Sequence, residues 1–310
     1  MSLILEVKHL SKQYKDAKAV DDLSFTVEEG DIYGFLGQNG AGKSTTIRML
    51  LTLIEPDGGE INIFGKNIVS PRHEILSQTG AIIERPDLYK YLSACDNLSI
   101  FARMSGIKVT RKLIMDQLEM VGLADRSNSK VRTFSQGMKQ RLGIAVALVH
   151  NPRLIILDEP TNGLDPQGIA DMRNLILKLS RQMGKTVLVS SHLLSEIEVI
   201  ATRMLIIHKG KKIVEGYVQE MLDPAKTLVQ LDTTDNGLAL EFLQTTKWGT
   251  GASAADKSIR LNINKNEIPQ LVSQLTERGT GIISVQPRHS LEAYFLSLTN
   301  NESHVEPFAN

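Results

Sequence analysis

The sequence predicts an α/β fold in which a buried parallel sheet carries an antiparallel β-subdomain, an inserted α-helical subdomain and a small C-terminal α+β domain. Residues 31–36 form an apolar strand that runs into a glycine-rich segment, after which apolar residues recur at helical spacing from Ile47 to Ile54. Residues 154–158 are a continuous apolar run, which is typical of a parallel strand buried on both faces. Beyond residue 225 the composition changes, and this change predicts the second domain.

Length and charge limit the classes of function. The 310 residues are 42% apolar, enough for one large and one small domain, and 35 basic residues balance 35 acidic ones. A nucleic-acid partner is not expected, because such proteins usually carry a basic excess. The single cysteine, Cys95, excludes an internal disulfide and suits a reducing compartment. No stretch resembles a signal peptide or a membrane span, so we expect a soluble chain.

The glycine-rich segment, residues 37–44, fits the phosphate-binding P-loop pattern of Gly, four residues and Gly-Lys-Ser. Its glycines allow a tight backbone turn, so that successive N–H groups face one anion. Lys43 adds a positive charge for the β- and γ-phosphates, and the Ser44 hydroxyl is a candidate ligand of Mg²⁺. The helix that begins here adds its positive N-terminal dipole. The first domain is therefore expected to have a P-loop NTPase core.

Strands are expected on both sides of the P-loop. Two short strands are predicted at 3–7 and 23–27, with the aromatic Tyr14 between them. An aromatic residue ahead of a P-loop can stack on a purine, although a half-buried strand residue is the commoner case. An antiparallel strand at 60–65 and a short apolar strand at 79–83 follow the P-loop helix.

The rest of the first domain, which is predicted to end at residue 222, contains a helical block and a return to the β/α pattern. From about 87 to 150 the pattern is helical, like an inserted subdomain, with breaks at Gly106 and Gly122. A helix and three strands then follow the apolar strand at 154–158. The predicted helices are 94–105, 110–121, 136–149 and 167–183, and the predicted strands are 186–190, 203–208 and 211–215.

The second domain is predicted at 225–300, and residues 301–310 are expected to form a polar, flexible tail. Helices and strands alternate along this domain, which indicates a small α+β fold with an antiparallel sheet. It contains no catalytic-looking cluster. The predicted order is strand 227–232, helix 236–245, a strand or hairpin at 248–263, helix 266–278, strand 281–286 and helix 290–298.

Two further groups of residues are candidates for phosphate chemistry. Asp158 and Glu159 end the buried strand, where parallel α/β sheets place their ligands. Asp158 can hold the hydration shell of Mg²⁺, and Glu159 can orient and deprotonate a water molecule. Ser135 and Gly137 open a helix, so that backbone N–H groups and the serine hydroxyl can face an anion. Taken alone, these two residues fit an ordinary helix cap better.

With these motifs in view, residues 1–220 resemble the ATP-binding subunit of ABC transporters. Residues 134–138, Phe-Ser-Gln-Gly-Met, are similar to the family signature, which is usually Leu-Ser-Gly-Gly-Gln. Residues 162–165, Asn-Gly-Leu-Asp, resemble its D-loop, His192 resembles its switch histidine, and Tyr14 resembles its adenine-stacking aromatic residue. The motifs stand in the family's order and on the element types that the family uses.

The resemblance implies that two such chains form a head-to-tail homodimer with ATP bound between them. The signature of each chain would complete the site of the partner chain, and Asp165 would link the two sites. Glu159 and His192 are the implied catalytic residues. The implied ATP-binding residues are Tyr14, Gly37, Asn39, Gly40, Gly42, Lys43, Ser44, Thr45, Ser135, Gly137 and Asp165, and the implied Mg²⁺ ligands are Ser44, Glu84 and Asp158.

The chain departs from the family pattern at two places. In the signature, Gln136 replaces the first glycine and Met138 replaces the final glutamine, but the serine and the second glycine remain. Glu84 follows the strand at 79–83, where the family usually has a glutamine that reaches Mg²⁺. A glutamate there resembles the subgroup that protects bacteria from bacitracin and lantibiotics, and the C-terminal domain, through residues 290–296, is similar to that subgroup's tail.

The resemblance therefore implies an ATPase that powers a separate membrane permease and exports an antimicrobial peptide. The chain would be peripheral to the cytoplasmic face of a bacterial cell membrane. One alternative is a soluble ABC-type ATPase that acts on nucleic acid or the ribosome, but such relatives carry long coiled-coil insertions or tandem ATPase domains, and this sequence shows neither. A second alternative is a regulatory ABC subunit that moves no cargo.

Overall fold

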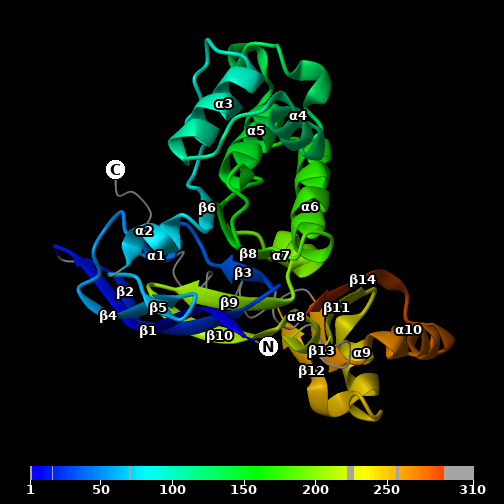
Figure 1. Cartoon of the computed structure of the whole chain (residues 1–310). Coiled ribbons are helices and arrows are strands. Elements are labelled where there is room, and N and C mark those ends of the chain that lie inside the picture. The colour runs from blue at the N-terminus through cyan, green and yellow to red at the C-terminus, as the bar shows by residue number, and fades with distance from the viewer. Residues whose placement is uncertain (1, 16, 70, 222–226, 256–257, 290–310) are drawn as a thin grey trace, which may run out of the picture. The chain divides into compact units, whose positions relative to one another are not determined.

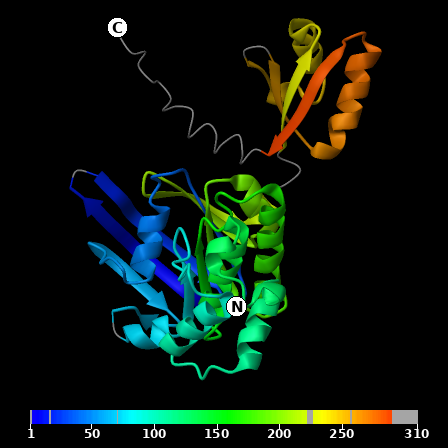
Figure 2. The same cartoon turned by 90° about the horizontal axis from the view of Figure 1, so that it is seen from above.

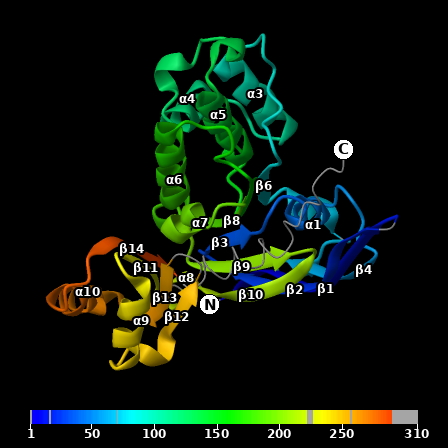
Figure 3. The ribbon, with the colours of Figure 1, turned by 180° about the vertical axis from the view of Figure 1, so that it is seen from behind.

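The chain divides into two compact units, one ending at Tyr217 and the other beginning at Val218. Each unit has its own apolar core. Figures 1, 2 and 3 show the ribbon from three sides, with the elements labelled in Figures 1 and 3. The predicted domain boundary at 222–225 falls outside the described residues and stays a prediction. The structure, a computed structural model, describes residues 2–15, 17–69, 71–221, 227–255 and 258–289.

A mostly parallel sheet forms the centre of the first unit. Its described strands are β3 (Ile32–Leu36), β6 (Thr79–Ile82), β7 (Leu154–Asp158), β8 (Thr186–Ser191), β9 (Arg203–His208) and β10 (Lys211–Tyr217). Their order is β10-β9-β3-β8-β7-β6, with β10 antiparallel to β9 and the other neighbours parallel. All residues of β3, β7 and β8 are buried, and for β7 the apolar run at 154–158 predicted this.

The N-terminal part of this unit forms an antiparallel sheet. Its strands are β1 (Leu3–Tyr14), β2 (Ala17–Glu28), β4 (Gly58–Ile63) and β5 (Lys66–Asn67), in the order β2-β1-β4-β5. β1 and β2 are each 12 residues long, whereas the sequence predicted strands only at 3–7 and 23–27. The pairing of β1 with β2 shifts register beyond Val7, and His9 and Asp22 have positive φ angles of 51° and 55°. These irregularities interrupt the alternation of side chains on which the prediction rested.

The predicted helical subdomain lies between β6 and β7 and contains α3 (Ala94–Met104), α4 (Arg111–Met120) and α5 (Gln136–Leu148). Figures 1 and 3 show these helices grouped together, apart from the antiparallel sheet. Ser93 and Asp96 form a capping box that starts α3. Gly106 and Gly122 have positive φ angles, as expected for glycines that end helices.

Further helices of the first unit are α1 (Lys43–Leu50), α2 (Arg72–Leu76), α6 (Pro166–Arg181) and α7 (Leu194–Ile200). α1 ends at Leu50, so the helical register predicted up to Ile54 is wrong; Thr52 has a φ angle of 56°, which no helical residue adopts. The sequence did not predict α2 and α7, because five and seven residues are too few to show a helical period. Within the described ranges, no helix is both long enough and apolar enough to cross a bilayer.

The second unit contains α8 (Val218–Met221), β11 (Thr227–Thr233), α9 (Asn236–Gln244), β12 (Ala252–Ala255), β13 (Ser258–Ile263), α10 (Ile268–Glu277) and β14 (Ile282–His289). From β11 onward the order is βαββαβ, and the antiparallel strands follow the order β12-β13-β11-β14. Every second residue of β11 is buried in a core that includes Trp248 and Leu271. This architecture matches the predicted α+β fold; the predicted helix 290–298 and tail 301–310 lie outside the described residues.

We predict that residues 1–221 fold without the rest of the chain. The first unit has its own core, which includes Tyr33, Phe35 and Leu188, and it contains all the predicted phosphate-binding residues. A chain ending at Met221 should therefore unfold cooperatively and bind ATP with an affinity within about threefold of the full-length value. Circular dichroism melting and titration with a fluorescent ATP analogue measure both properties. An insoluble product would show that the second unit supports the core.

Candidate functional site

The P-loop connects β3 to α1, and close backbone contacts require its glycines. A Cβ atom at Gly37 would lie 2.7 Å from the carbonyl oxygen of Ile207, and one at Gly42 would lie 2.4 Å from that of Ala19. Gly42 also has a φ angle of 106°, which other residues rarely adopt. No side chain caps the start of α1 in the described structure, so its first N–H groups remain available to an anion.

Lys43 is almost fully buried at the centre of the site, with 5% of its side chain exposed. Its Nζ donates hydrogen bonds to the carbonyl oxygens of Gly37 at 2.7 Å and Gln38 at 3.2 Å. It also lies 3.1 Å from Oε1 of Glu159. A buried cation needs such partners, because an unpaired charge in the interior is costly. The loop and Glu159 therefore hold the lysine where phosphate charges are expected.

Glu159 also contacts His192, whose Nδ1 lies 2.7 Å from Oε2 of the carboxylate. Glu159 follows β7 and His192 follows β8, and these two strands are parallel neighbours. Since the carboxyl ends of neighbouring strands meet at one edge of the sheet, residues 33 positions apart in the sequence come into contact. The structure thus joins Lys43, Glu159 and His192 in one chain of polar contacts.

Asp158 and Ser190 form a pair that sequence reasoning missed. Asp158 is fully buried at the end of β7, and Ser190 lies opposite it on β8. The serine Oγ donates to Asp158 Oδ1 at 2.5 Å and accepts a hydrogen bond from the N–H of Glu159 at 2.9 Å. Glu159 has a φ angle of 50°, a strained conformation that costs roughly 1–3 kcal/mol. The signal that could have found Ser190 was the predicted pairing of two parallel strands that end in polar residues.

The oxygen atoms at this edge suit a divalent cation. Oδ2 of Asp158 is buried and has no hydrogen-bond partner among the described residues. The Ser44 hydroxyl, in the first turn of α1, supplies a second oxygen. The described residues contain no cluster of three or more His, Cys, Asp or Glu side chains suited to a metal. Mg²⁺ does not need one, because it is usually held by one or two carboxylates together with substrate phosphates. These residues therefore fit Mg²⁺.

A second buried carboxylate, Glu196 of α7, was also missed by sequence reasoning. Only 6% of it is exposed, and its Oε2 accepts hydrogen bonds from Thr161 Oγ1 at 2.7 Å and Ser191 Oγ at 2.8 Å. Thr161 follows Glu159, and Ser191 precedes His192. Glu196 therefore links, through hydrogen bonds, the segment after β7 that carries Glu159 and the end of β8 that precedes His192.

The signature and D-loop residues lie at the starts of two helices. Ser135 caps α5, where its Oγ accepts a hydrogen bond from Met138 N at 3.2 Å, and Asp165 caps α6 in the same way. Both residues are exposed. A Cβ atom at Gly137 would meet only Leu164 Cδ2, at 3.9 Å, so nothing in its own chain excludes a side chain there. Ser135 is therefore a helix cap in this structure, as one of its two interpretations predicted, and the first turn of α5 remains accessible to another molecule.

The predicted contacts to the base and the outer P-loop are at the surface. Tyr14 ends β1 with 46% of the residue exposed, and Lys12 Nζ lies 5.7 Å from the centre of its ring. Asn39 and Gly40 are exposed, and Thr45 is half-buried in the first turn of α1. An exposed ring of this kind is available for stacking on a purine.

Glu84 lies at the surface, separated by Ile83 from the end of β6 at Ile82. Its side chain is 63% exposed, and Oε1 lies 2.6 Å from Nη2 of Arg48 on α1. Exposed ion pairs usually contribute about 1 kcal/mol or less, so the pair with Arg48 would not prevent the carboxylate from binding a metal. The predicted Mg²⁺ role of Glu84 stays a prediction, and Arg48 is its partner in this structure.

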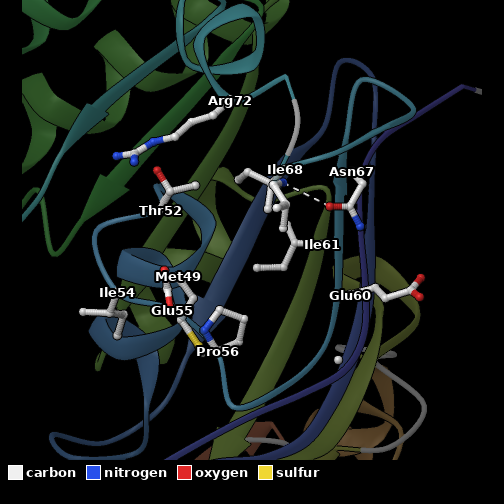
Figure 4. A pocket seen from close by; sticks show the side chains of 12 residues that line it. Met49, Thr52, Ile54, Glu55, Pro56, Glu60, Ile61, Asn67, Ile68 and Arg72 are labelled. Carbon is white, nitrogen blue, oxygen red and sulfur yellow. Dashed lines mark hydrogen bonds between the residues drawn. The ribbon is translucent and has the colours of Figure 1, made fainter.

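A hollow of the first unit, whose lining side chains are drawn in Figure 4, has a volume of about 190 Å³, and its lining includes none of the predicted site residues. Met49, Ile61 and Ile68 give it largely apolar walls, with Arg72 on its rim. Its volume is below the roughly 300–1,000 Å³ of typical small-molecule sites. The hollow is therefore not a candidate nucleotide site.

Known proteins match this chain, some over nearly all of it and others over about two thirds of it. Residues 20–162 match the family model described as ABC transporter. The bacitracin transport ATP-binding protein BcrA of Bacillus licheniformis is 42% identical over 300 residues, 96% of this chain and 98% of BcrA. The lantibiotic transport ATP-binding protein SrtF of Streptococcus pyogenes is 42% identical over 212 residues, 68% of this chain and 90% of SrtF. The solved structure of the ATP-binding cassette MJ0796, a dimer bound to ADP and Pi, has 26% identity and a TM-score of 0.63, and the match covers 69% of this chain and 98% of that one. These findings confirm the predicted fold class, the family resemblance and its subgroup.

We predict that Glu84 contributes to Mg²⁺ binding, and both members of its ion pair can be varied to test this. Glu84→Ala should raise the Mg²⁺ concentration for half-maximal ATPase activity about tenfold. Glu84→Gln should raise it less than Glu84→Ala does, because an amide oxygen is a weaker ligand than a carboxylate but can still bind the ion. Arg48→Gln frees the carboxylate and should leave that concentration unchanged or lower it. Steady-state assays at fixed ATP give the curves of the wild type and of the three variants. Coincident curves would make Glu84 a surface residue.

Proposed function

We propose that this chain, which belongs to the ABC transporter family as an ATP-binding and ATP-hydrolysing subunit, powers a separate membrane permease that exports an antimicrobial peptide. A bacitracin-like or lantibiotic-like cargo would give the cell resistance or immunity. The chain would work at the cytoplasmic face of a bacterial membrane, bound to the permease.

One observation carries the proposed cargo class: the similarity to the bacitracin relative extends through the second unit as well as the ATPase unit. ATPase units are built alike in ABC proteins with many different cargoes, so a match of that unit alone says little about cargo. A match that includes the second unit is a narrower feature and favours a related cargo. The balanced net charge of the chain favours this proposal over an ATPase that acts on nucleic acid.

The P-loop N–H groups and Lys43 would hold the phosphates of ATP, and Tyr14 would stack on its base. In the structure, Lys43 is paired with Glu159 and with two loop carbonyls. The γ-phosphate carries more negative charge than one carboxylate, so it would replace Glu159 as the partner of the lysine. The carboxylate would then be free to act on water.

Ser44 and Asp158 would hold Mg²⁺, with Glu84 as a further proposed ligand. The ion, when bound, would screen the negative charge of the phosphates. Glu159 would orient the attacking water and accept its proton, which is the role of a general base. His192, which lies 2.7 Å from Glu159, would contact the γ-phosphate and help to place that water.

A complete site requires two chains in this proposal, because each chain has one P-loop and one signature segment. Ser135 and the first N–H groups of α5 would contact the γ-phosphate bound by the partner chain. The open space around Gly137 supports a close approach by another molecule at this turn. Asp165, exposed at the start of α6, would lie at the interface between the two sites.

Glu159→Gln should abolish hydrolysis without abolishing ATP binding. The amide keeps the shape of the side chain but cannot accept the proton, and loss of a general base commonly slows a reaction roughly 10²–10⁴-fold. Lys43→Ala should instead weaken nucleotide binding. Phosphate release and equilibrium binding of a fluorescent ATP analogue separate the two effects. Wild-type turnover by Glu159→Gln would remove Glu159 as the base and, with it, the proposed mechanism.

The same variant tests the proposed dimer. Glu159→Gln with ATP should elute as a dimer on size exclusion, because the bound nucleotide is not consumed. Adding Gly137→Asp places an acid in the first turn of α5, which favours the helix but repels a phosphate. This second change should leave the melting temperature unchanged or higher and prevent the ATP-dependent dimer. A dimer that survives it would place the signature away from the nucleotide.

Export itself is tested in a bacterium that is sensitive to bacitracin and lantibiotics. Expression of the chain together with its permease should raise the inhibitory concentration of one of these peptides, and Glu159→Gln should abolish the increase. The chain should also copurify with the permease in detergent. Unchanged sensitivity with an active ATPase would indicate a regulatory subunit, and copurification with ribosomes would indicate the nucleic-acid alternative.

A further inference from the structure

Ser190 occupies a position that none of the recognised motifs explains. It lies near the end of β8, is fully buried, and stands opposite Asp158 across the parallel strands. Its Oγ donates to Asp158 Oδ1 at 2.5 Å and accepts a hydrogen bond from the N–H of Glu159 at 2.9 Å. One hydroxyl therefore contacts both Asp158, the last residue of β7, and Glu159, which follows it.

The chemistry of the partners fixes the direction of both hydrogen bonds. A carboxylate oxygen can only accept, so the hydroxyl proton of Ser190 points to Asp158, and an oxygen lone pair remains for the N–H of Glu159. A separation of 2.5 Å is in the range of strong hydrogen bonds between a hydroxyl and a carboxylate. The hydroxyl thus has one orientation that satisfies both neighbours.

The first hydrogen bond fixes the orientation of the Asp158 carboxylate. Oδ1 is occupied by Ser190, whereas Oδ2 has no hydrogen-bond partner among the described residues. The side chain is fully buried, so bulk water does not compete with Ser190 for Oδ1. The free oxygen is therefore held in one direction, as a ligand for a small cation must be.

The second hydrogen bond acts on the backbone at Glu159. This residue has a φ angle of 50°, in the left-handed region that residues other than glycine rarely adopt. With the backbone turned in this way, the side chain reaches Lys43 Nζ at 3.1 Å and His192 Nδ1 at 2.7 Å. Ser190 holds the N–H at the point where the chain makes this turn.

We propose that Ser190 is a positioning residue, which aims the free oxygen of Asp158 at Mg²⁺ and holds the backbone turn that directs Glu159. The inference rests on the proposed function, because the roles of Asp158 and Glu159 belong to that proposal. Ser190 would act only through these two residues, so its loss should lower the affinity for the metal much more than the affinity for the nucleotide.

Ser191 provides a matched control in the same strand. It is the next residue, only 1% exposed, and has the same side chain. Its Oγ donates to Glu196 Oε2 at 2.8 Å rather than to Asp158 or Glu159. A general loss of packing at the end of β8 should affect Ser190→Ala and Ser191→Ala alike, whereas metal positioning should affect only the first.

Metal binding can be measured without hydrolysis by electron paramagnetic resonance of Mn²⁺ added to the full-length chain with ADP. Ser190→Ala should raise the Mn²⁺ dissociation constant about 10- to 100-fold, the usual effect of removing a hydrogen-bond partner of a metal ligand. Its affinity for ADP without metal should stay within about twofold of wild type. Ser191→Ala should leave the Mn²⁺ constant unchanged, and Ser190→Thr, which keeps the hydroxyl, should restore it.

An unchanged Mn²⁺ constant in Ser190→Ala, or an equal rise in Ser190→Ala and Ser191→Ala, would overturn the inference. If Ser190→Ala does not fold, Ser190→Cys supplies the comparison, because a thiol has a similar volume and is a weaker donor. These outcomes are independent of the Glu159→Gln test. A Glu159→Gln variant that hydrolyses ATP at the wild-type rate would defeat the proposed mechanism, whereas a Glu159→Gln variant with little activity, together with normal Mn²⁺ binding in Ser190→Ala, would defeat only the role of Ser190.

Discussion

The polar site depends on one constraint, that the carboxyl ends of neighbouring parallel strands lie at the same edge of a sheet. β3, β8 and β7 are neighbours, and therefore Lys43, Glu159 and His192 meet although they are far apart in the sequence. The apolar side chains of these strands set their register, which places Asp158 opposite Ser190. A slip of one residue would turn every side chain of a strand to the other face. The apolar core thus determines the geometry of the polar edge.

Two carboxylates at this edge, the half-buried Glu159 and the buried Glu196, are stabilised in different ways, and the difference separates their roles. Glu159 contacts a lysine and a histidine, so its partners are groups that can carry positive charge. Glu196 accepts hydrogen bonds from the hydroxyls of Thr161 and Ser191, which are neutral. An anion that binds here competes with Glu159 for the positive charge of Lys43. It does not compete in this way for the neutral hydroxyls that hold Glu196. Glu196 is therefore suited to a fixed structural role and Glu159 to a changing one.

The sequence predicted what local patterns encode. The P-loop, the apolar strands β3, β7 and β8, and the helices α3 to α6 follow from motifs and periodicity, and the comparisons confirm the family to which these patterns pointed. Ser190, Glu196 and the pairing of Glu84 with Arg48 were not predicted, because these contacts join residues that only the tertiary fold brings together. The short helices α2 and α7 lacked a readable period. Only residues 3–7 of β1 and 23–27 of β2 were predicted, because the irregular pairing of these strands breaks the alternation of buried and exposed side chains.

The glycines of the P-loop and of the signature segment differ in how closely other atoms of the same chain surround them. At Gly37 and Gly42, an added Cβ would lie 2.7 Å and 2.4 Å from carbonyl oxygens of the same chain, so the fold itself requires glycine. At Gly137 the nearest atom would be 3.9 Å away, and glycine in a helix costs up to about 1 kcal/mol relative to alanine. No contact within the described chain requires glycine at this position. In the proposed dimer, a phosphate held by a second subunit would approach the backbone N–H groups here closely, and glycine would leave room for that approach.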